Sequence, residues 1–302
     1  MKKRWTVGTR GSKLALIQTG MVIDALAGLY PDSDFAVKTI KTTGDSVWNT
    51  PLYLIGEKGL FIKEIEEALA AGEVDLAVHS IKDLPTELLG GLSLSAVLER
   101  EDPRDAFISV KHASLADAPV GARVGTGSMR RKSQLLALRP DLEIAPLRGN
   151  VDTRVKKLQE QDLDAIILAY AGVKRMGLES SVREALPLDV MIPACGQGAV
   201  GIETRSGSDA ALLVKPLNHE ATRFEVDIER TFQAGAGGGC SVPLGINASL
   251  SGARVTLRAA YGNEAGAIIF RDRLEGERAE GAALVEGLLD GLSRARAAAL
   301  SR

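Results

Sequence analysis

The sequence is poor in the two side chains that most often form cross-links and metal sites. Its 302 residues include two cysteines, Cys195 and Cys240, which are too few for a disulfide framework. The three histidines, His79, His112 and His219, are scattered and match no metal-ligand spacing, so we predict no metal site. Free thiols are typical of a reducing compartment, and we therefore expect a cytoplasmic protein.

The sequence also lacks long apolar runs and an excess of charge of one sign. No apolar run reaches the roughly 18 residues of a membrane span, so we expect none. No apolar segment with a cleavage site follows the basic first five residues, so we expect no secretory signal. A net charge of −2 gives no reason to expect nucleic acid as a partner. A chain of 302 residues with 45% hydrophobic content should hold two or three globular domains.

Strand-like and helix-like segments alternate through the first two thirds of the chain. Strands separated by helices imply parallel sheets, so we expect an α/β fold here. The predicted strands cover residues 5–9, 35–40, 74–78, 92–98, 123–126, 142–147 and 164–169. The predicted helices begin near Ser12, Leu60, Ser128 and Asn150. In the first helix, helical spacing is kept by the apolar positions Leu14, Ile17, Met21 and Ala25.

Two segments predict that the chain crosses between two lobes. Residues 99–105 are charged and contain a proline, and we interpret them as the first crossing. Residues 193–199 are rich in glycine and predict a second crossing, with residues 200–203 as a strand that returns to the first lobe. Two crossings between α/β lobes would make a hinged cleft. The domains that we expect are residues 1–99 with 198–217, residues 104–193, and residues 219–302.

The last third of the chain predicts an α+β domain. Residues 221–233 have helical periodicity, with Phe224, Ile228 and Phe232 four residues apart. Strand-like runs at 246–250, 255–260 and 267–274 lead to a final helix that is rich in alanine and leucine. We expect an antiparallel sheet with helices on one face.

A polar turn, residues 79–85, follows directly on the apolar strand 74–78. It contains Lys82 and Asp83 side by side, at the expected carboxyl end of the strand. Ligands of open α/β sheets bind at such ends. A lysine can hold anions there, and an aspartate can handle protons or positive charge. The alternative interpretation is a solvated turn with a surface ion pair.

Arginines stand at three predicted junctions between a strand and a helix. Arginine near a helix N-terminus is unfavourable without an anion, and an anion there also meets free backbone N–H groups. The junctions carry Arg10 with Ser12, Arg130 and Arg131 after Ser128, and Arg148 with Gly149, Asn150 and Arg154. Taken singly, each arginine could be a surface residue paired with a nearby acid. Together they predict a ligand with several phosphates or carboxylates, and the absence of a Walker-type run argues against a nucleotide.

The two cysteines differ in their surroundings. Cys195 is interpreted as a small buried hydrophobic residue. Cys240 follows the glycine-rich residues 235–239 and precedes the loop 241–245. A flexible arm of this kind can present a thiol into a cleft, as a nucleophile or as an attachment point. The alternative for Cys240 is again a buried structural residue.

Motifs along essentially the whole chain are similar to those of one enzyme family. They are found at residues 9–12, 56–61, 79–85, 99–107, 125–131, 147–151, 196–201 and 238–245. The chain thus resembles the porphobilinogen deaminases, with every motif in the family's order.

The resemblance implies a transferase of tetrapyrrole biosynthesis. The family joins four porphobilinogen molecules head to tail, releasing ammonia each time, and makes the linear tetrapyrrole hydroxymethylbilane. It builds on a dipyrromethane cofactor that a thioether fixes to a cysteine, here Cys240. The implied fold is two lobes like those of periplasmic solute-binding proteins, plus a C-terminal α+β domain. The family also implies a monomer, in addition to the cytoplasmic location and the absence of nucleic-acid and membrane partners that we expect from the composition.

The resemblance also assigns roles to individual residues. Asp83 is implied as the catalytic residue. The implied cofactor contacts, besides Cys240, are Ser80, Lys82, Thr126, Ser128, Arg130 and Arg131. The implied substrate contacts are Arg10, Ser12, Gln18, Lys58, Arg148, Gly149 and Arg154.

Two departures and two alternatives complete the prediction. Gly127 stands where many relatives carry a hydroxyl residue, so one carboxylate contact is absent or is made by the backbone. Residues 235–239 contain more glycine than is usual in the family. The main alternative is a two-lobe solute-binding protein for a polycarboxylate, which would need neither Asp83 nor Cys240. The effector half of a transcription regulator would need a helix-turn-helix segment, which we do not find.

Overall fold

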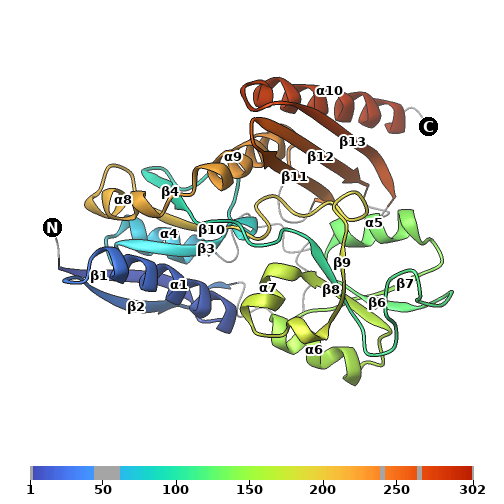
Figure 1. The fold of residues 1–302 in the computed structure, drawn as a ribbon, viewed down its shortest axis with the longest axis horizontal. Helices are drawn as coiled ribbons and strands as arrows, with labels where there is room; N and C mark the ends of the chain where they lie inside the picture. Colours follow the sequence, from blue (N-terminus) through green and yellow to red (C-terminus); the bar gives the residue numbers. More distant parts are fainter. Residues whose placement is uncertain (1–2, 44–61, 239–241, 264–266, 301–302) are drawn as a thin grey trace.

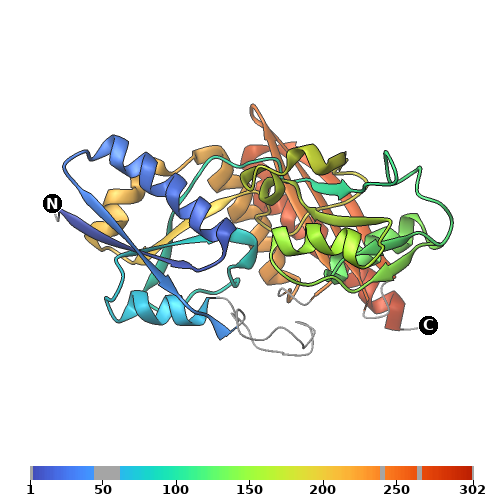
Figure 2. The ribbon, with the colours of Figure 1, turned by 90° about the horizontal axis from the view of Figure 1, so that it is seen from below.

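The computed structural model describes residues 3–43, 62–238, 242–263 and 267–300. In these residues the chain forms two α/β lobes and a C-terminal α+β domain, so the predicted fold class is confirmed (Figure 1). The first lobe, blue, cyan and orange in Figure 1, lies beside the second, which is green and yellow. The same separation is visible from below in Figure 2.

The first lobe is a five-stranded sheet between helices. Its strand order is β2-β1-β3-β10-β4. The strands are β1 (Arg4–Arg10), β2 (Asp34–Ile40), β3 (Leu76–Ser80), β4 (Leu92–Val97) and β10 (Val200–Arg205). The helices are α1 (Lys13–Leu29), α4 (Lys63–Ala70) and α8 (Asp209–Val214), and short 3-10 turns η1 (Ile81–Asp83) and η3 (Lys215–Leu217) extend β3 and α8. Helices α1 and α8 pack on one face of the sheet and α4 on the other.

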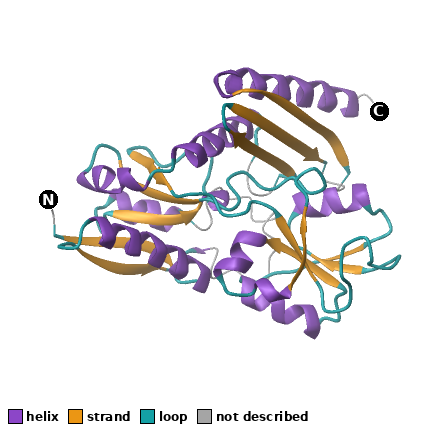
Figure 3. Ribbon diagram, in the orientation of Figure 1, coloured by secondary structure: helices purple, strands orange, loops and turns teal. Residues whose placement is uncertain are grey.

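The second lobe repeats this arrangement of a sheet between helices (Figure 3). Its strand order is β7-β6-β8-β5-β9. Its strands are β5 (Asp105–Ile108), β6 (Arg123–Gly125), β7 (Glu143–Ala145), β8 (Ala165–Ala169) and β9 (Val182–Leu186). Its helices are α5 (Met129–Leu138), α6 (Val151–Glu160) and α7 (Tyr170–Arg175), with the turn η2 (Glu179–Ser181) before β9. Helix α5 covers one face, while α6 and α7 cover the other.

The expectation of purely parallel sheets was wrong, because each sheet contains antiparallel strands. In the first sheet β10 runs antiparallel to β3 and β4, and in the second β5 runs antiparallel to β8 and β9. Both β10 and β5 begin directly after a crossing between the lobes. Each therefore enters its sheet at the edge where its neighbours β3 and β8 end, which forces the opposite direction.

The two crossings lie side by side. The amide of Glu101 in the first donates a hydrogen bond to the carbonyl of Gly198 in the second, over 3.3 Å. Residues 200–205 return to the first sheet, as expected for the returning strand. The domain boundaries given above remain a proposal.

The C-terminal part is an antiparallel sheet of β11 (Leu244–Ser251), β12 (Arg254–Gly262) and β13 (Ile268–Glu277). Helices α9 (Glu220–Gly235) and α10 (Gly281–Leu300) share a core with this sheet, and the turn η4 (Arg278–Glu280) precedes α10. The predicted stripe on α9 contributes to that core, with Phe232 fully buried, Ile228 buried and Phe224 packed against it. In the described part of the chain, no helix is long and apolar enough to cross a membrane.

Helix α1 is present, and Ser12 caps it by accepting a hydrogen bond from the amide of Ala15. The apolar stripe from the sequence is not its buried face, however. The buried residues are Gln18, Thr19, Val22 and Leu26, whereas Met21 is 40% exposed. Helix α1 carries apolar side chains on several faces. The spacing of these residues in the sequence therefore could not identify the face that packs on the sheet.

Candidate active site

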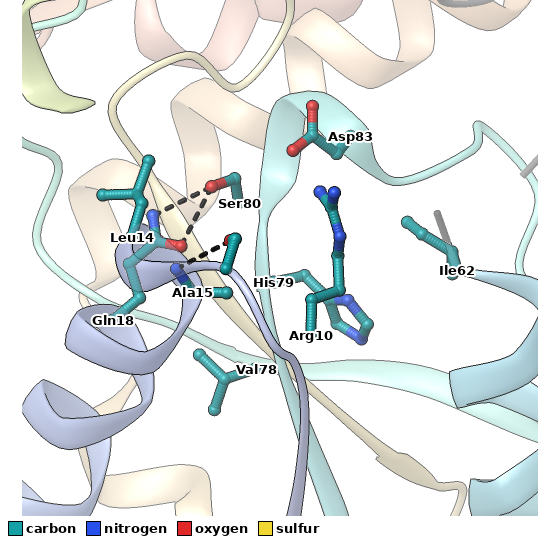
Figure 4. Close-up of a pocket in the computed structure, with 10 residues that line it drawn as sticks. Arg10, Leu14, Ala15, Gln18, Ile62, Val78, His79, Ser80 and Asp83 are labelled. Carbon is teal, nitrogen blue, oxygen red and sulfur yellow. Dashed lines mark hydrogen bonds between the residues drawn. The ribbon is translucent and has the colours of Figure 1, made fainter. Parts of the chain in front are cut away.

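A small pocket lies at the carboxyl ends of β1 and β3. The two strands are parallel neighbours, with Val7 paired to Leu76, so they end at the same edge of the sheet. The pocket is lined by Arg10, Ser12, Leu14, Ala15, Gln18, Ile62, Val78, His79, Ser80 and Asp83 (Figure 4). The structure thus gathers five of the predicted site residues from three segments of the first lobe.

One wall of this pocket is fixed by a contact between α1 and β3. The side-chain amide nitrogen of Gln18 donates a hydrogen bond of 2.8 Å to the hydroxyl of Ser80. On the other side, the guanidinium group of Arg10 points toward the carboxylate of Asp83 (Figure 4). A carboxylate and a cation therefore lie at the mouth of the same pocket.

Lys82 and Asp83 belong to the 3-10 turn that extends β3. Burial lowers the pKa of Lys82 to about 8; Asp83 and Asp105 counteract this effect, while Arg131 and Arg154 add to it. Lys82 in the first lobe is therefore close to charged groups of the second. A lysine with this pKa is still mostly charged at pH 7, and it loses its charge as the pH rises through about 8.

The second lobe contributes its arginines from two strand–helix junctions. Burial lowers the pKa of Arg154 to about 10; Arg131 and Arg148 add to the effect, and Asp83 opposes it. The Nε of Arg154 donates to the carbonyl oxygen of Gly149 at 2.7 Å, which fixes the guanidinium group. Gly149 has a φ of 119°, which favours glycine, and a Cβ there would lie 2.7 Å from Cγ2 of Thr153.

Arg130 and Arg131 are held by a carboxylate that we did not predict. Both guanidinium groups donate to the fully buried Asp105 at the start of β5, at 2.7 and 2.8 Å. The amide nitrogen of Gln197, from the second crossing, donates to the same carboxylate at 3.0 Å. Burial alone would raise the pKa of Asp105, but the two arginines outweigh it and hold that pKa well below its usual range. Arg130 also donates to the carbonyl of Ile192, so its bonds serve the interior of the fold.

The hydroxyl residues of this junction have local partners. Ser128 caps α5 by accepting a hydrogen bond from the amide of Arg131, as predicted. The hydroxyl of Thr126 accepts a bond from the amide of Ser128. A Cβ on Gly127 would lie 2.7 Å from the carbonyl oxygen of Leu147, so the backbone leaves no room for a side chain here.

Two predicted site residues, Lys58 and Cys240, lie outside the described residues. Asp105 is the residue that the sequence pattern missed. It lies in the charged run 99–105, which we interpreted as a crossing, and no local pattern distinguishes it from the other charged residues of that run. Its role depends on arginines 25 and 26 positions later in the sequence.

Comparison with protein families identifies this arrangement. The model described as "Porphobilinogen deaminase, dipyromethane cofactor binding domain" matches residues 5–213. The family's C-terminal domain matches residues 223–290. The chain belongs to the porphobilinogen deaminase family.

Curated porphobilinogen deaminases match this chain over nearly its full length. The protein of Roseiflexus sp. (strain RS-1) is 49% identical over 300 residues, covering 98% of this chain and 99% of its own. That of Roseiflexus castenholzii is 50% identical over 295 residues, covering 96% and 97%. The porphobilinogen deaminase of Syntrophomonas wolfei is 51% identical over 253 residues, covering 83% of each chain.

Solved structures of solute-binding proteins are more remote. A nutrient-binding protein from Burkholderia cenocepacia bound to methionine has a TM-score of 0.44 and 16% identity, covering 70% of this chain and 91% of its own. The aliphatic sulphonate binding protein of Escherichia coli has a TM-score of 0.42 and 17% identity, covering 78% and 71%. Likenesses this weak carry no argument. The alternative of a solute-binding function therefore has no support beyond them.

The residues of the site fit the cofactor of the porphobilinogen deaminase family. A dipyrromethane carries an acetate and a propionate on each ring, so it needs several cations at one place. Lys82 and Arg154 interact electrostatically with Asp83 and with Arg131, and Arg148 interacts with Arg154. Arg10 points toward the carboxylate of Asp83 (Figure 4). This set suits a chain of carboxylate-bearing rings better than a neutral solute.

Proposed function

We propose that the pocket and the cations that face it form the active site of a hydroxymethylbilane synthase. In the reaction of this transferase family, four porphobilinogen molecules condense stepwise into hydroxymethylbilane, and each step releases ammonia. The observation that carries the proposal is the position of Asp83. It lies at the pocket with Arg10, and it interacts with Lys82 of its own lobe and Arg154 of the other.

The cations bind and orient the substrate in this proposal. Planar guanidinium groups can grip carboxylates with two parallel hydrogen bonds. Arg10 and Ser12 at the end of β1, together with Arg148 and Arg154 of the second lobe, would hold the acetate and propionate groups of an incoming ring. Gln18, tied to Ser80, shapes the wall next to them. Lys58 belongs to the same proposal from the segment that the structure does not describe.

Asp83 handles charge and protons in this proposal. Loss of ammonia from the aminomethyl group leaves porphobilinogen as an electron-poor cation. A carboxylate beside the ring nitrogen stabilises that cation, and preorganised groups of this kind contribute roughly 3–4 kcal/mol. Asp83 would also assist protonation of the departing amine and accept the ring proton after the new carbon–carbon bond has formed.

Cys240 would hold the dipyrromethane cofactor covalently, and nearby cations and hydroxyl groups would bind its carboxylates. When bound, this group supplies the ring carbon from which the chain of pyrroles grows. Ser80, Lys82, Thr126, Ser128, Arg130 and Arg131 are the residues that we propose for its binding. Asp105 would keep the guanidinium group of Arg131 in place for that task.

The intact mass of the purified protein tests the function and the attachment site together. We expect an excess over the sequence mass that equals two linked pyrroles, and we expect Cys240→Ser to lack it. A bare mass would be followed by incubation with porphobilinogen. Bare protein that gains no pyrrole mass and forms no bilane would refute the proposal.

A cytoplasmic monomer without nucleic-acid or membrane partners is part of the same proposal. It is supported by the near-neutral net charge of −2 and by the family resemblance. Size-exclusion chromatography with light scattering would reveal any stable oligomer.

A further inference from the structure

One of the residues that line the pocket, His79, belongs to a buried histidine–carboxylate pair. The Nε2 of His79 on β3 lies 3.0 Å from Oε2 of Glu203 on β10. The side chain of His79 is 3% exposed and that of Glu203 is fully buried. In the antiparallel register His79 is opposite Gly201 and Glu203 is opposite Ala77, so the two side chains share the face of the sheet that α4 covers.

This pair has little other support in the fold. Apart from the contact between them and an interaction of Glu203 with the carboxyl group of Glu66, neither the carboxylate of Glu203 nor Nε2 of His79 has a hydrogen-bond partner among the described residues. Glu66 on α4 is a third member of the cluster: burial raises its pKa, and the negative charge of Glu203 raises it further. Apolar side chains would fill this space at lower cost than buried charges. A chemical role would explain why charged groups stand here.

His79 is connected to the catalytic region by the pocket itself. His79 and Asp83 both line this pocket, and its volume is about 50 Å³ (Figure 4). That volume is enough for water, since a cavity of roughly 10–15 Å³ can hold one water molecule. A water molecule between the two residues could pass a proton from one to the other.

We propose that His79, backed by Glu203, takes up the proton that each condensation delivers to Asp83. This inference rests on the proposed function. In each cycle the carbon–nitrogen bond of the aminomethyl group breaks, a carbon–carbon bond forms, and the ring carbon loses a proton to Asp83. That proton passes through water to His79 and then to the solvent, where ammonia takes it up. Asp83 is thereby a carboxylate again before the next cationic ring forms.

The charges around His79 suit a transient proton. Glu203, in contact with Nε2 of His79, compensates the positive charge of an imidazolium. Glu66 adds a carboxyl from α4, Asp83 faces the pocket from η1, and Arg10 contributes a cation from β1. The imidazole thus has a buried carboxylate that attracts a proton, and it shares the pocket with a cation that favours release of the proton. His79 acts through Asp83, and Glu203 is a positioning residue for it.

Three variants of the cofactor-loaded enzyme test this role. We expect His79→Gln and Glu203→Gln to keep the pyrrole mass and the KM for porphobilinogen, and to lose kcat by about tenfold or more. His112→Gln is the matched control. His112 also lies near a carboxylate, with its Nε2 3.6 Å from Asp164, but it belongs to the second lobe and does not line the pocket. We expect this control to have the kcat of the parent enzyme.

A second readout is independent of turnover. The chain has three histidines, so their ring signals in NMR spectra can be assigned by substitution. In Glu203→Gln we expect the ring signals of His79 to shift, since the carboxylate 3.0 Å from its Nε2 loses its charge. The signals of His112 and His219 should not change.

Each result has a definite meaning. Normal kcat and an unchanged pH profile in a loaded Glu203→Gln enzyme would overturn the inference, even if His79→Gln failed to fold. Unshifted His79 signals in that variant would overturn it as well. If the parent protein itself formed no bilane from porphobilinogen, the proposed function would fail instead, and the two failures are thereby distinguished.

Discussion

The guanidinium group of Arg131 donates a hydrogen bond of 2.8 Å to the carboxylate of Asp105, which has no exposed surface. Arg130 and Gln197 bond to the same carboxylate. Asp105 thus orients two neighbouring arginines and offsets part of their charge. Because Gln197 belongs to the second crossing, it also ties this arrangement to the connection between the lobes.

Removing the charge of Asp105 should destabilise the protein strongly. Asp105→Asn leaves two buried guanidinium groups without their counter-charge, and loss of one partner from a buried pair costs about 3–5 kcal/mol. Urea unfolding measures this change. Asp141→Asn is the matched control, because Asp141 pairs with Arg139 in a more exposed place and its loss should cost much less stability. Equal losses in both variants would contradict our view of Asp105.

The same residue predicts acid sensitivity. The folded pKa of Asp105 lies below its unfolded value, so its contribution to stability is complete above the unfolded value of about 4. This contribution is lost as the pH falls below that value toward the folded pKa. The free energy of unfolding of the parent protein should therefore fall more steeply below about pH 4 than that of Asp105→Asn. Parallel curves would show that Asp105 is not responsible.

Neutralising Asp83 should separate turnover from assembly. We expect Asp83→Asn to keep its fold and its pyrrole mass, because neither depends on the negative charge at that position. Bilane formation should fall at least about 100-fold, since the cation formed on loss of ammonia loses its carboxylate. Glu87→Gln, an exposed substitution four residues later, should have normal activity. Near-normal bilane production by Asp83→Asn would end its assignment as the catalytic residue.

Lys82 predicts a pH dependence of substrate binding. Because its pKa is lowered to about 8, it loses its charge as the pH rises through that value. Fewer cations then surround the cofactor-borne pyrrole chain that the substrate joins, so KM should rise above about pH 8. Lys82→Arg should remove this rise, since arginine keeps its charge. Lys174→Arg is the control, because Glu101 raises the pKa of Lys174 away from this range. A rise that persists in Lys82→Arg would exclude Lys82 as its source.

Gly127 should resist replacement by a residue with a hydroxyl side chain. A Cβ there would meet the carbonyl oxygen of Leu147 at 2.7 Å, so we expect Gly127→Ser to cost about 1–3 kcal/mol. Gly20→Ala adds a Cβ in open space on α1 and should be neutral or stabilising by up to about 1 kcal/mol. Thermal unfolding compares the two variants. A Gly127→Ser protein with parental stability would mean that the loop shifts freely.

Local patterns predicted many of the helices and strands but not the long-range pairing. Ser12 and Ser128 were identified as helix caps because capping depends on residues within one turn. The strands β5 and β9 were not predicted, since β5 is only four residues long and starts with an aspartate inside a charged run. The direction of β10 depends on which edge of the sheet the chain enters, and no local pattern contains that information.

The site could be predicted in part for the same reason. Arg131 and Arg154 were identified by their places at helix starts. Asp105 was not, because its meaning comes from partners in another segment. The contact between His79 and Glu203 could not be predicted from the sequence either, because 124 positions separate the two residues.

The pairing of Asp105 with Leu186 places the two ends of the second sheet's segment next to each other. In genetic terms, this segment is an insertion within the first lobe. Because its two ends lie next to each other, this segment could be deleted from the gene, and a short linker would join the two flanking parts of the first lobe. The first lobe, by contrast, has no contiguous gene fragment of its own, because β10 reaches it only after the insertion has been translated. A ribosome-bound chain therefore cannot complete the sheet beneath Asp83 until about two thirds of the protein have emerged.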